Sequence, residues 1–218
     1  MRTRRGLSLL IAALLLAEPA LAYQSPLSDT AVRDAYFLGR RQDGSLADFF
    51  ALYSQFFPQP DSGPYIRVVS FYTPFAEEVI RSSQRPAGYS AQDAEQSHNP
   101  EAEVVTIRYE IVLTGSYGPF IVSPPPTRHS TNGLTPRPSD FWRDFEFEIF
   151  DGKRRVQPAG VAGDPQYNCS DFGCTLTGAK ITLTFPANAF TSDTAEVTIY
   201  PPEDYDPVHA EFAIDSLR

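Results

Sequence analysis

The sequence contains few of the residues from which metal and redox sites are built. Among its 218 residues are two cysteines, three histidines and one methionine. The histidines, His98, His129 and His209, lie far apart, and none has a second histidine at ligand spacing, so each is expected on the surface. Phosphate loops, dinucleotide-binding turns and the motifs of zinc proteases and serine hydrolases are also absent. The sequence therefore assigns no metal ligand, no cofactor and no catalytic residue.

Long apolar runs are missing except at the N-terminus. One run extends from Leu7 to Leu16, follows three arginines and is closed by Ala20-Leu21-Ala22. This order is typical of a secretory signal peptide over residues 1–22. A transmembrane helix needs about 20 apolar residues, which disfavours an uncleaved anchor. We expect export to the periplasm or the outside of the cell, with no membrane insertion after cleavage.

Basic residues are in the minority. The chain has 18 Lys and Arg against 27 Asp and Glu, a net charge of −9. Cleavage after Ala22 removes three arginines and Glu18, which leaves 196 residues with a net charge of −11. Such a chain binds polyanions poorly, so neither nucleic acid nor an anionic membrane surface is expected as a partner.

The two cysteines, Cys169 and Cys174, are close in sequence. In an exported protein an even cysteine count favours a disulfide. The residues between them suit a hairpin tip with Gly173 at a positive φ. Because the spacing is not C-x-x-C, a thioredoxin-like redox role is disfavoured.

Alternating apolar residues predict an antiparallel sheet. In the clearest run, 103–113, Val105, Ile107 and Tyr109 fall on one side of an extended strand and polar residues on the other. Residues 161–169 are expected to be irregular. Short alternating strands with Gly/Pro turns are typical of an antiparallel β-sandwich, Ig-like or related. Further strands are expected at 65–72, 141–150, 175–185, 195–200 and 208–214, with brief pairing at 120–122 and 154–157.

Capping signals predict helices near the N-terminus. Ser28 or Asp29 is expected to cap a helix that runs to about Leu38, and Ser45 a second helix through about Phe56. Further helices are expected after Thr73-Pro74 and over 90–96.

We therefore expect a mainly β protein with an N-terminal helical segment, 23–60, and a β-sandwich domain with short helical insertions, 61–218. No boundary separates them, so they form one compact unit. Residues 123–139 are rich in Pro, Ser and Thr and are expected to form a long exposed loop. A mobile connector is favoured there over a ligand for an aromatic groove.

Three carboxylates, Asp144, Glu146 and Glu148, are expected on one strand face. Paired carboxylates are what a glycoside hydrolase uses, but the same pattern is typical of a solvated sheet face, which is favoured. The loop 203–206 is acidic as well. Asp204 and Asp206 are the residues there that suit Ca²⁺, although a solvated loop is favoured again.

Three stretches, 34–41, 89–96 and 140–145, resemble recurring stretches of an uncharacterised secreted bacterial protein family. They read Asp-Ala-Tyr-Phe-Leu-Gly-Arg-Arg, Tyr-Ser-Ala-Gln-Asp-Ala-Glu-Gln and Asp-Phe-Trp-Arg-Asp-Phe. The resemblance covers most of the mature chain and implies no activity and no site residue.

The expected function is that of an exported, non-enzymatic binding or structural protein of the bacterial cell envelope, with an envelope protein or a glycan as its partner. The alternative is an envelope glycan hydrolase that uses Glu146 and Glu148. A weaker third hypothesis is an adhesion module stabilised by Ca²⁺ at Asp204 and Asp206.

Overall fold

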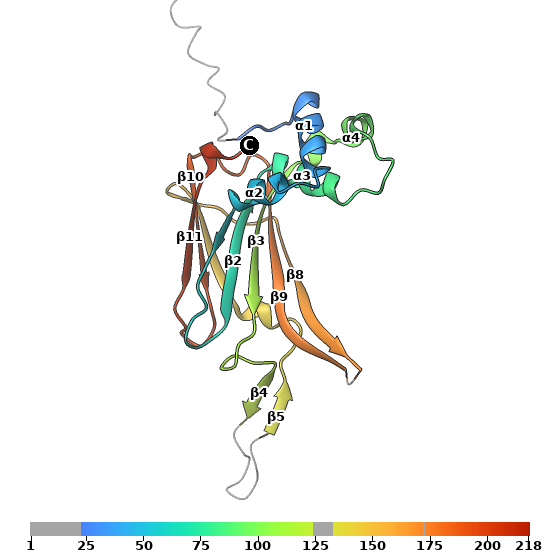
Figure 1. Cartoon of the computed structure of the whole chain (residues 1–218). Helices are drawn as coiled ribbons and strands as arrows, with labels where there is room; N and C mark the ends of the chain where they lie inside the picture. Colours follow the sequence, from blue (N-terminus) through green and yellow to red (C-terminus); the bar gives the residue numbers. More distant parts are fainter. Residues whose placement is uncertain (1–22, 124–132, 172) are drawn as a thin grey trace, which may run out of the picture.

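The computed structural model describes residues 23–123, 133–171 and 173–218, so the predicted leader lies outside the described residues. The two main sheets contain β1 Ser54–Phe56, β2 Tyr65–Tyr72, β3 Val104–Val112, β6 Glu146–Asp151, β7 Arg154–Arg155, β8 Gly160–Ser170, β9 Gly173–Pro186, β10 Thr194–Tyr200 and β11 Val208–Ala213. One sheet has the order β1-β2-β3-β9-β8 and the other β11-β10-β6-β7, both antiparallel. They face each other in a sandwich, with helices at one end and a hairpin of β4 (Phe120–Ser123) and β5 (Gly133–Pro136) projecting from the other (Figure 1). The predicted mainly β, sandwich-like fold is confirmed.

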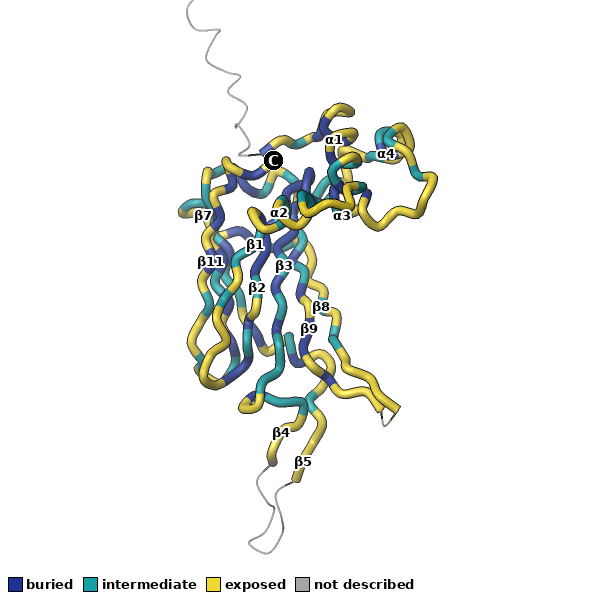
Figure 2. The backbone as a smooth tube through the Cα atoms, viewed as in Figure 1, coloured by how far each residue is buried: buried dark blue, intermediate teal, exposed yellow. Residues whose placement is uncertain are grey.

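Apolar side chains from both sheets fill the space between them. On β3, every second residue from Val105 to Ile111 is at most 2% exposed. Ile107 lies opposite Leu183 of β9, which is also fully buried. Because alternate residues of a strand point to opposite faces, this burial confirms the predicted face. Each such side chain contributes about 1.5–3 kcal/mol through burial, and Figure 2 shows the buried positions along the middle of the sandwich.

The helices enclose a second, smaller apolar cluster. Val32, Val79 and Ala94 are fully buried in it. Gly39 lies so close to the helix that carries Val79 that a Cβ would overlap the Val79 carbonyl oxygen. The helix predicted over 90–96 is present and begins with a capping box of Ser90 and Asp93. The helices are α1 Asp29–Gly39, α2 Ser45–Ala51, α3 Pro74–Ser83 and α4 Ala91–Ser97.

The second helix is shorter than predicted. Its aromatic spacing predicts a helix through Phe56, but α2 ends at Ala51 and the next residues form β1. Ser54 pairs with Ser70 of β2, and the buried Tyr53 hydroxyl donates to the Arg218 carbonyl oxygen over 3.2 Å. Pairing with β2 therefore outweighs the local helical pattern.

Three other segments differ from the prediction. Residues 161–169, predicted irregular, belong to β8, because they pair with β9 along their whole length. The predicted loop 123–139 contains β5, and its residues 124–132 lie outside the described residues. Phe141–Asp144, predicted as strand, is a 3₁₀ helix, and β6 begins only at Glu146.

The predicted disulfide between Cys169 and Cys174 is confirmed at the exposed tip of the β8–β9 hairpin. Gly173 has a φ of +125°, a conformation that only glycine adopts readily. The bond therefore closes a short surface hairpin and leaves the core to apolar packing.

Asp151, at the end of β6, is a buried structural carboxylate. It accepts hydrogen bonds from the Ser192 N–H (2.7 Å), from the Thr191 N–H (3.1 Å) and from Arg154 (2.6 Å). Burial alone raises the pKa of a carboxyl group, but these donors outweigh it, so the pKa of Asp151 is lowered. The carboxylate therefore fixes the turn before β10 in its ionised form.

Candidate functional site

The predicted carboxylate face lies on the outside of the smaller sheet. Glu148 lies 3.3 Å from the Arg155 guanidinium and accepts a hydrogen bond of 3.0 Å from the Tyr200 hydroxyl, which raises the pKa of Tyr200. Glu146 is on the same strand, whereas Asp144 is in the preceding 3₁₀ helix. Glu148 therefore interacts with two neighbouring side chains on an exposed sheet face. This arrangement favours a solvated face over a pair of catalytic carboxylates.

The acidic loop 203–206 has an unusual backbone. Glu203 and Asp204 both have positive φ angles, 62° and 57°. Tyr205 points inward, where its ring meets that of Tyr117 at 6.3 Å. Within residues 23–123, 133–171 and 173–218, no group of three or more His, Cys, Asp or Glu side chains is placed to hold a metal ion.

The histidines differ from one another. His209 is exposed on β11, as predicted, with its Nδ1 3.0 Å from the Thr198 hydroxyl, and His129 lies outside the described residues. His98 is buried, with 8% side-chain exposure, so its predicted surface position is wrong. Glu78, from a helix 20 residues earlier in the chain, and the nearby Glu103 meet at its ring, and no local pattern reveals this.

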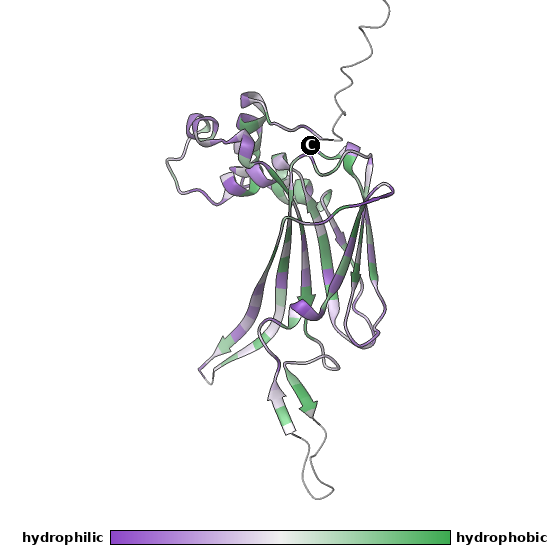
Figure 3. Ribbon diagram, turned by 180° about the vertical axis from the view of Figure 1, so that it is seen from behind, coloured by the Kyte–Doolittle hydropathy of each residue, from purple (hydrophilic) through white to green (hydrophobic). Residues whose placement is uncertain are grey.

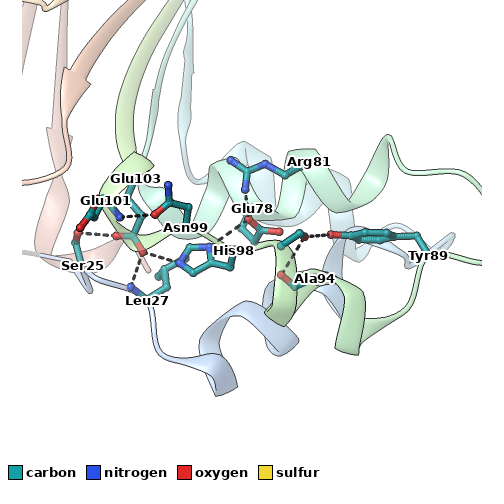
Figure 4. A network of polar contacts seen from close by, with 11 residues as sticks. Ser25, Leu27, Glu78, Arg81, Tyr89, Ala94, His98, Asn99, Glu101 and Glu103 are labelled. Atoms are coloured by element: carbon teal, nitrogen blue, oxygen red, sulfur yellow. Dashed lines mark hydrogen bonds and ion pairs between the residues drawn. The ribbon is translucent and has the colours of Figure 1, made fainter.

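His98 sits between two buried carboxylates (Figure 4). Its Nε2 is 2.9 Å from Glu103 Oε1 and its Nδ1 is 3.8 Å from Glu78 Oε2, and both carboxylates are 3% exposed. When Glu103 is ionised its oxygens only accept, and Nε2 is then the donor of this bond. We call Glu78, His98 and Glu103 the clasp.

The clasp joins the helical end to the sandwich. Glu103 also accepts from the Ser25 hydroxyl and from the Leu27 N–H, each over 2.7 Å. Glu78, on α3, accepts from Arg81 over 2.7 Å. Hydrogen bonds to Glu103 thus tie the start of the described chain and His98 to the residue before β3. The α3 residue Glu78 only approaches His98, at 3.8 Å.

A cavity of about 250 Å³ lies beside the clasp. Its lining is mixed in charge, with Glu77, Arg81, Arg85 and the three clasp residues among the members. The buried His98 Nδ1 has no hydrogen-bond partner in the described part of the chain. Arg81 donates to Glu78, and Glu103 is hydrogen-bonded to His98, Ser25 and Leu27, so both carboxylates already have partners within the cluster, which fits a structural role.

The β4–β5 hairpin is the second candidate. Phe120, Ile121, Val122 and Leu134 are 52, 40, 60 and 68% exposed. Figure 3 shows β4 as a hydrophobic strand on this projection. Soluble proteins rarely expose apolar side chains in such a group unless it serves an interaction.

The base of the hairpin is firmly held. Tyr117 is 2% exposed, and burial raises its pKa to about 12. The Arg137 guanidinium lies 3.6 Å from the centre of the Tyr117 ring and donates to the Gly118 carbonyl oxygen over 2.8 Å. A cation against an aromatic face stabilises by about 0.5–2 kcal/mol. These contacts anchor the base of the hairpin to the sandwich. The sequence favoured a mobile connector over 123–139, with a ligand for an aromatic groove as the alternative.

No family model matches the chain, and no curated protein sequence matches it significantly. The site must therefore be judged on its geometry.

Proposed function

We propose that this is an exported, non-enzymatic binding protein of the bacterial cell envelope, and that the β4–β5 hairpin is its binding element. One observation carries the proposal. Four large apolar side chains are exposed together on the eight residues of the hairpin, whose base is fixed by Tyr117 and Arg137. An unpaired apolar strand edge is a template for another chain, and proteins that do not use such an edge usually protect it.

Export is supported by the leader pattern in residues 1–22 and by the disulfide, which persists in oxidising compartments. Among the described residues, no helix is long and apolar enough to cross a membrane. Periplasmic or extracellular residence and an envelope partner belong to the proposal.

The test is capture of partners by the tagged mature protein from its own envelope fraction after mild cross-linking. The hairpin variant carries Phe120→Ser, Val122→Ser and Leu134→Ser. A matched control, Leu52→Ser, removes an apolar side chain that is 70% exposed near the helical end. We expect a reproducible partner with the wild type and with the control, and its loss with the hairpin variant. Equal capture by all three proteins would refute the assignment of the hairpin.

A further inference from the structure

We infer that the partner binds as an additional β-strand along the outer edge of β4, and that this strand is apolar on one face and acidic. The inference rests on the proposed function and specifies how the hairpin is used.

Among the described residues, β4 and β5 form a two-stranded sheet, and its register shows which backbone groups of each strand point away from the other. Phe120 lies opposite Pro136 and Val122 opposite Leu134, while the Arg137 N–H donates to the Pro119 carbonyl oxygen over 2.8 Å. In an antiparallel ladder hydrogen-bonded and non-hydrogen-bonded pairs alternate. The Arg137–Pro119 bond therefore makes the pairs of Phe120 and Val122 non-hydrogen-bonded, so the backbone N–H and C=O groups of both residues point away from β5.

The two edges of the hairpin are not equivalent. On β5 the backbone groups that point away from β4 belong to Leu134 and Pro136, and Pro136 has no N–H to donate. On β4 the backbone groups that point away from β5 belong to Phe120 and Val122, and together they offer two N–H donors and two C=O acceptors. The β4 edge is thus the one that can accept a full strand.

The side chains along this edge are also unprotected. Phe120, Val122 and Leu134 share one face of the hairpin, because they belong to non-hydrogen-bonded pairs, and each is more than half exposed. β4 contains neither a charged residue nor a proline. By contrast, edge strand β8 contains Asp164 and Pro165, which hinder pairing with another chain.

Charge indicates the chemistry of the partner. From Ile111 to Ser139 the sequence has no Asp or Glu, although the chain has 27, and Arg137 lies at the base of the hairpin. An acidic strand therefore complements the hairpin, whereas the rest of the protein repels it. A second copy fits less well, because its own β4 has the same uncharged sequence and brings no acidic side chain to the paired strands.

The experiment uses full-length mature protein and a labelled ten-residue peptide of alternating valine and glutamate, with valine–lysine and valine–serine peptides as controls. We expect fluorescence anisotropy to show binding of the valine–glutamate peptide at least about tenfold tighter than either control. Val122→Pro removes one outward N–H and leaves the bonds to β5 in place, so it should weaken binding about tenfold, roughly one backbone hydrogen bond. Val122→Ala retains the N–H and should weaken binding less. No binding to the wild type, or equal binding by wild type and Val122→Pro, would overturn strand addition.

Hydrogen exchange provides a second readout that does not depend on a variant. The peptide should slow exchange of the Phe120 and Val122 amides and leave the Ile121 amide, already bonded to β5, unchanged. Concentration-dependent dimers of the wild type that Val122→Pro abolishes would assign the edge to a second copy and overturn the acidic partner. If the serine-substituted hairpin loses its cross-linked partner while Val122→Pro retains it, strand addition fails and the proposed function stands. If both retain it, the proposed function fails.

Discussion

Replacing Glu103 by alanine is expected to destabilise the protein by about 3–5 kcal/mol, because it leaves buried hydrogen-bond donors without an acceptor. Glu103 is 3% exposed, and it accepts from His98, Ser25 and the Leu27 N–H. The substitution leaves the His98 and Leu27 donors buried and unpaired, and each such donor costs about 1–3 kcal/mol. For a chain of this size the melting temperature should fall by roughly 8–15 °C.

Urea unfolding of the mature protein measures the loss in the free energy of unfolding. An unchanged m-value shows that the wild type and Glu103→Ala unfold in the same way. Glu103→Gln is the matched control, because its amide oxygen can keep both bonds made by Oε1 and its NH₂ group can donate to Ser25. Glu103→Gln should lower the free energy of unfolding clearly less than Glu103→Ala does. A double-mutant cycle with His98→Ala should give a coupling of about 1 kcal/mol or more. An alanine variant within about 1 kcal/mol of the wild type would refute the clasp as the link between the helical end and the sandwich.

Three further predictions concern the fold. Because the pKa of Asp151 is lowered, the stabilisation that this carboxylate provides is present above the pKa of an unfolded carboxyl group, about 4, and is lost as the pH falls through the folded value. Asp151→Asn should therefore have a lower free energy of unfolding in urea than the wild type at pH 7, with a smaller difference at pH 3. Equal differences at the two pH values would contradict this. Replacing Cys169 and Cys174 by serine should cost no more than about 2 kcal/mol in thermal unfolding, since the closed loop is short; loss of folding would show a larger role. Gly163→Ala places a Cβ against the indole ring of Trp142, the one tryptophan of the chain. The fluorescence maximum of the protein should therefore shift, and an unchanged spectrum would show that the indole ring does not lie against residue 163.

The sandwich could be predicted where burial follows the local pattern. Val105 and Ile107 alternate with polar residues, and this period of two determines both the strand and its buried face. β8 was missed because most of it is exposed, so its pairing with β9, and not its own sequence, makes it a strand. Tyr53 and Phe56 fit a helical face equally well, and only the approach of β2 shows that the chain is extended there.

The candidate sites depend on contacts between distant segments. A lone histidine in a polar stretch is usually a surface residue, and burial of His98 requires Glu78 and Glu103 to meet it from other elements. The β4–β5 hairpin is difficult to predict from the sequence for a related reason. β5 pairs with β4 across nine intervening residues, and its Gly-Leu-Thr-Pro sequence has no strand alternation of its own. The exposure of Phe120 and Val122 follows only from that pairing.

The central claim, that the hairpin is the binding element, is tested most directly by site-specific photo-cross-linking in living cells. A photoreactive amino acid is placed at Val122 in one protein and at Leu52 in the control, since both positions are exposed and apolar. Val122 belongs to β4 and Leu52 directly follows α2, and these two elements lie at opposite ends of the molecule (Figure 1). We expect a discrete cross-linked product from position 122 and none from position 52. Products from position 52 alone, or none from 122 with protein correctly exported, would contradict it.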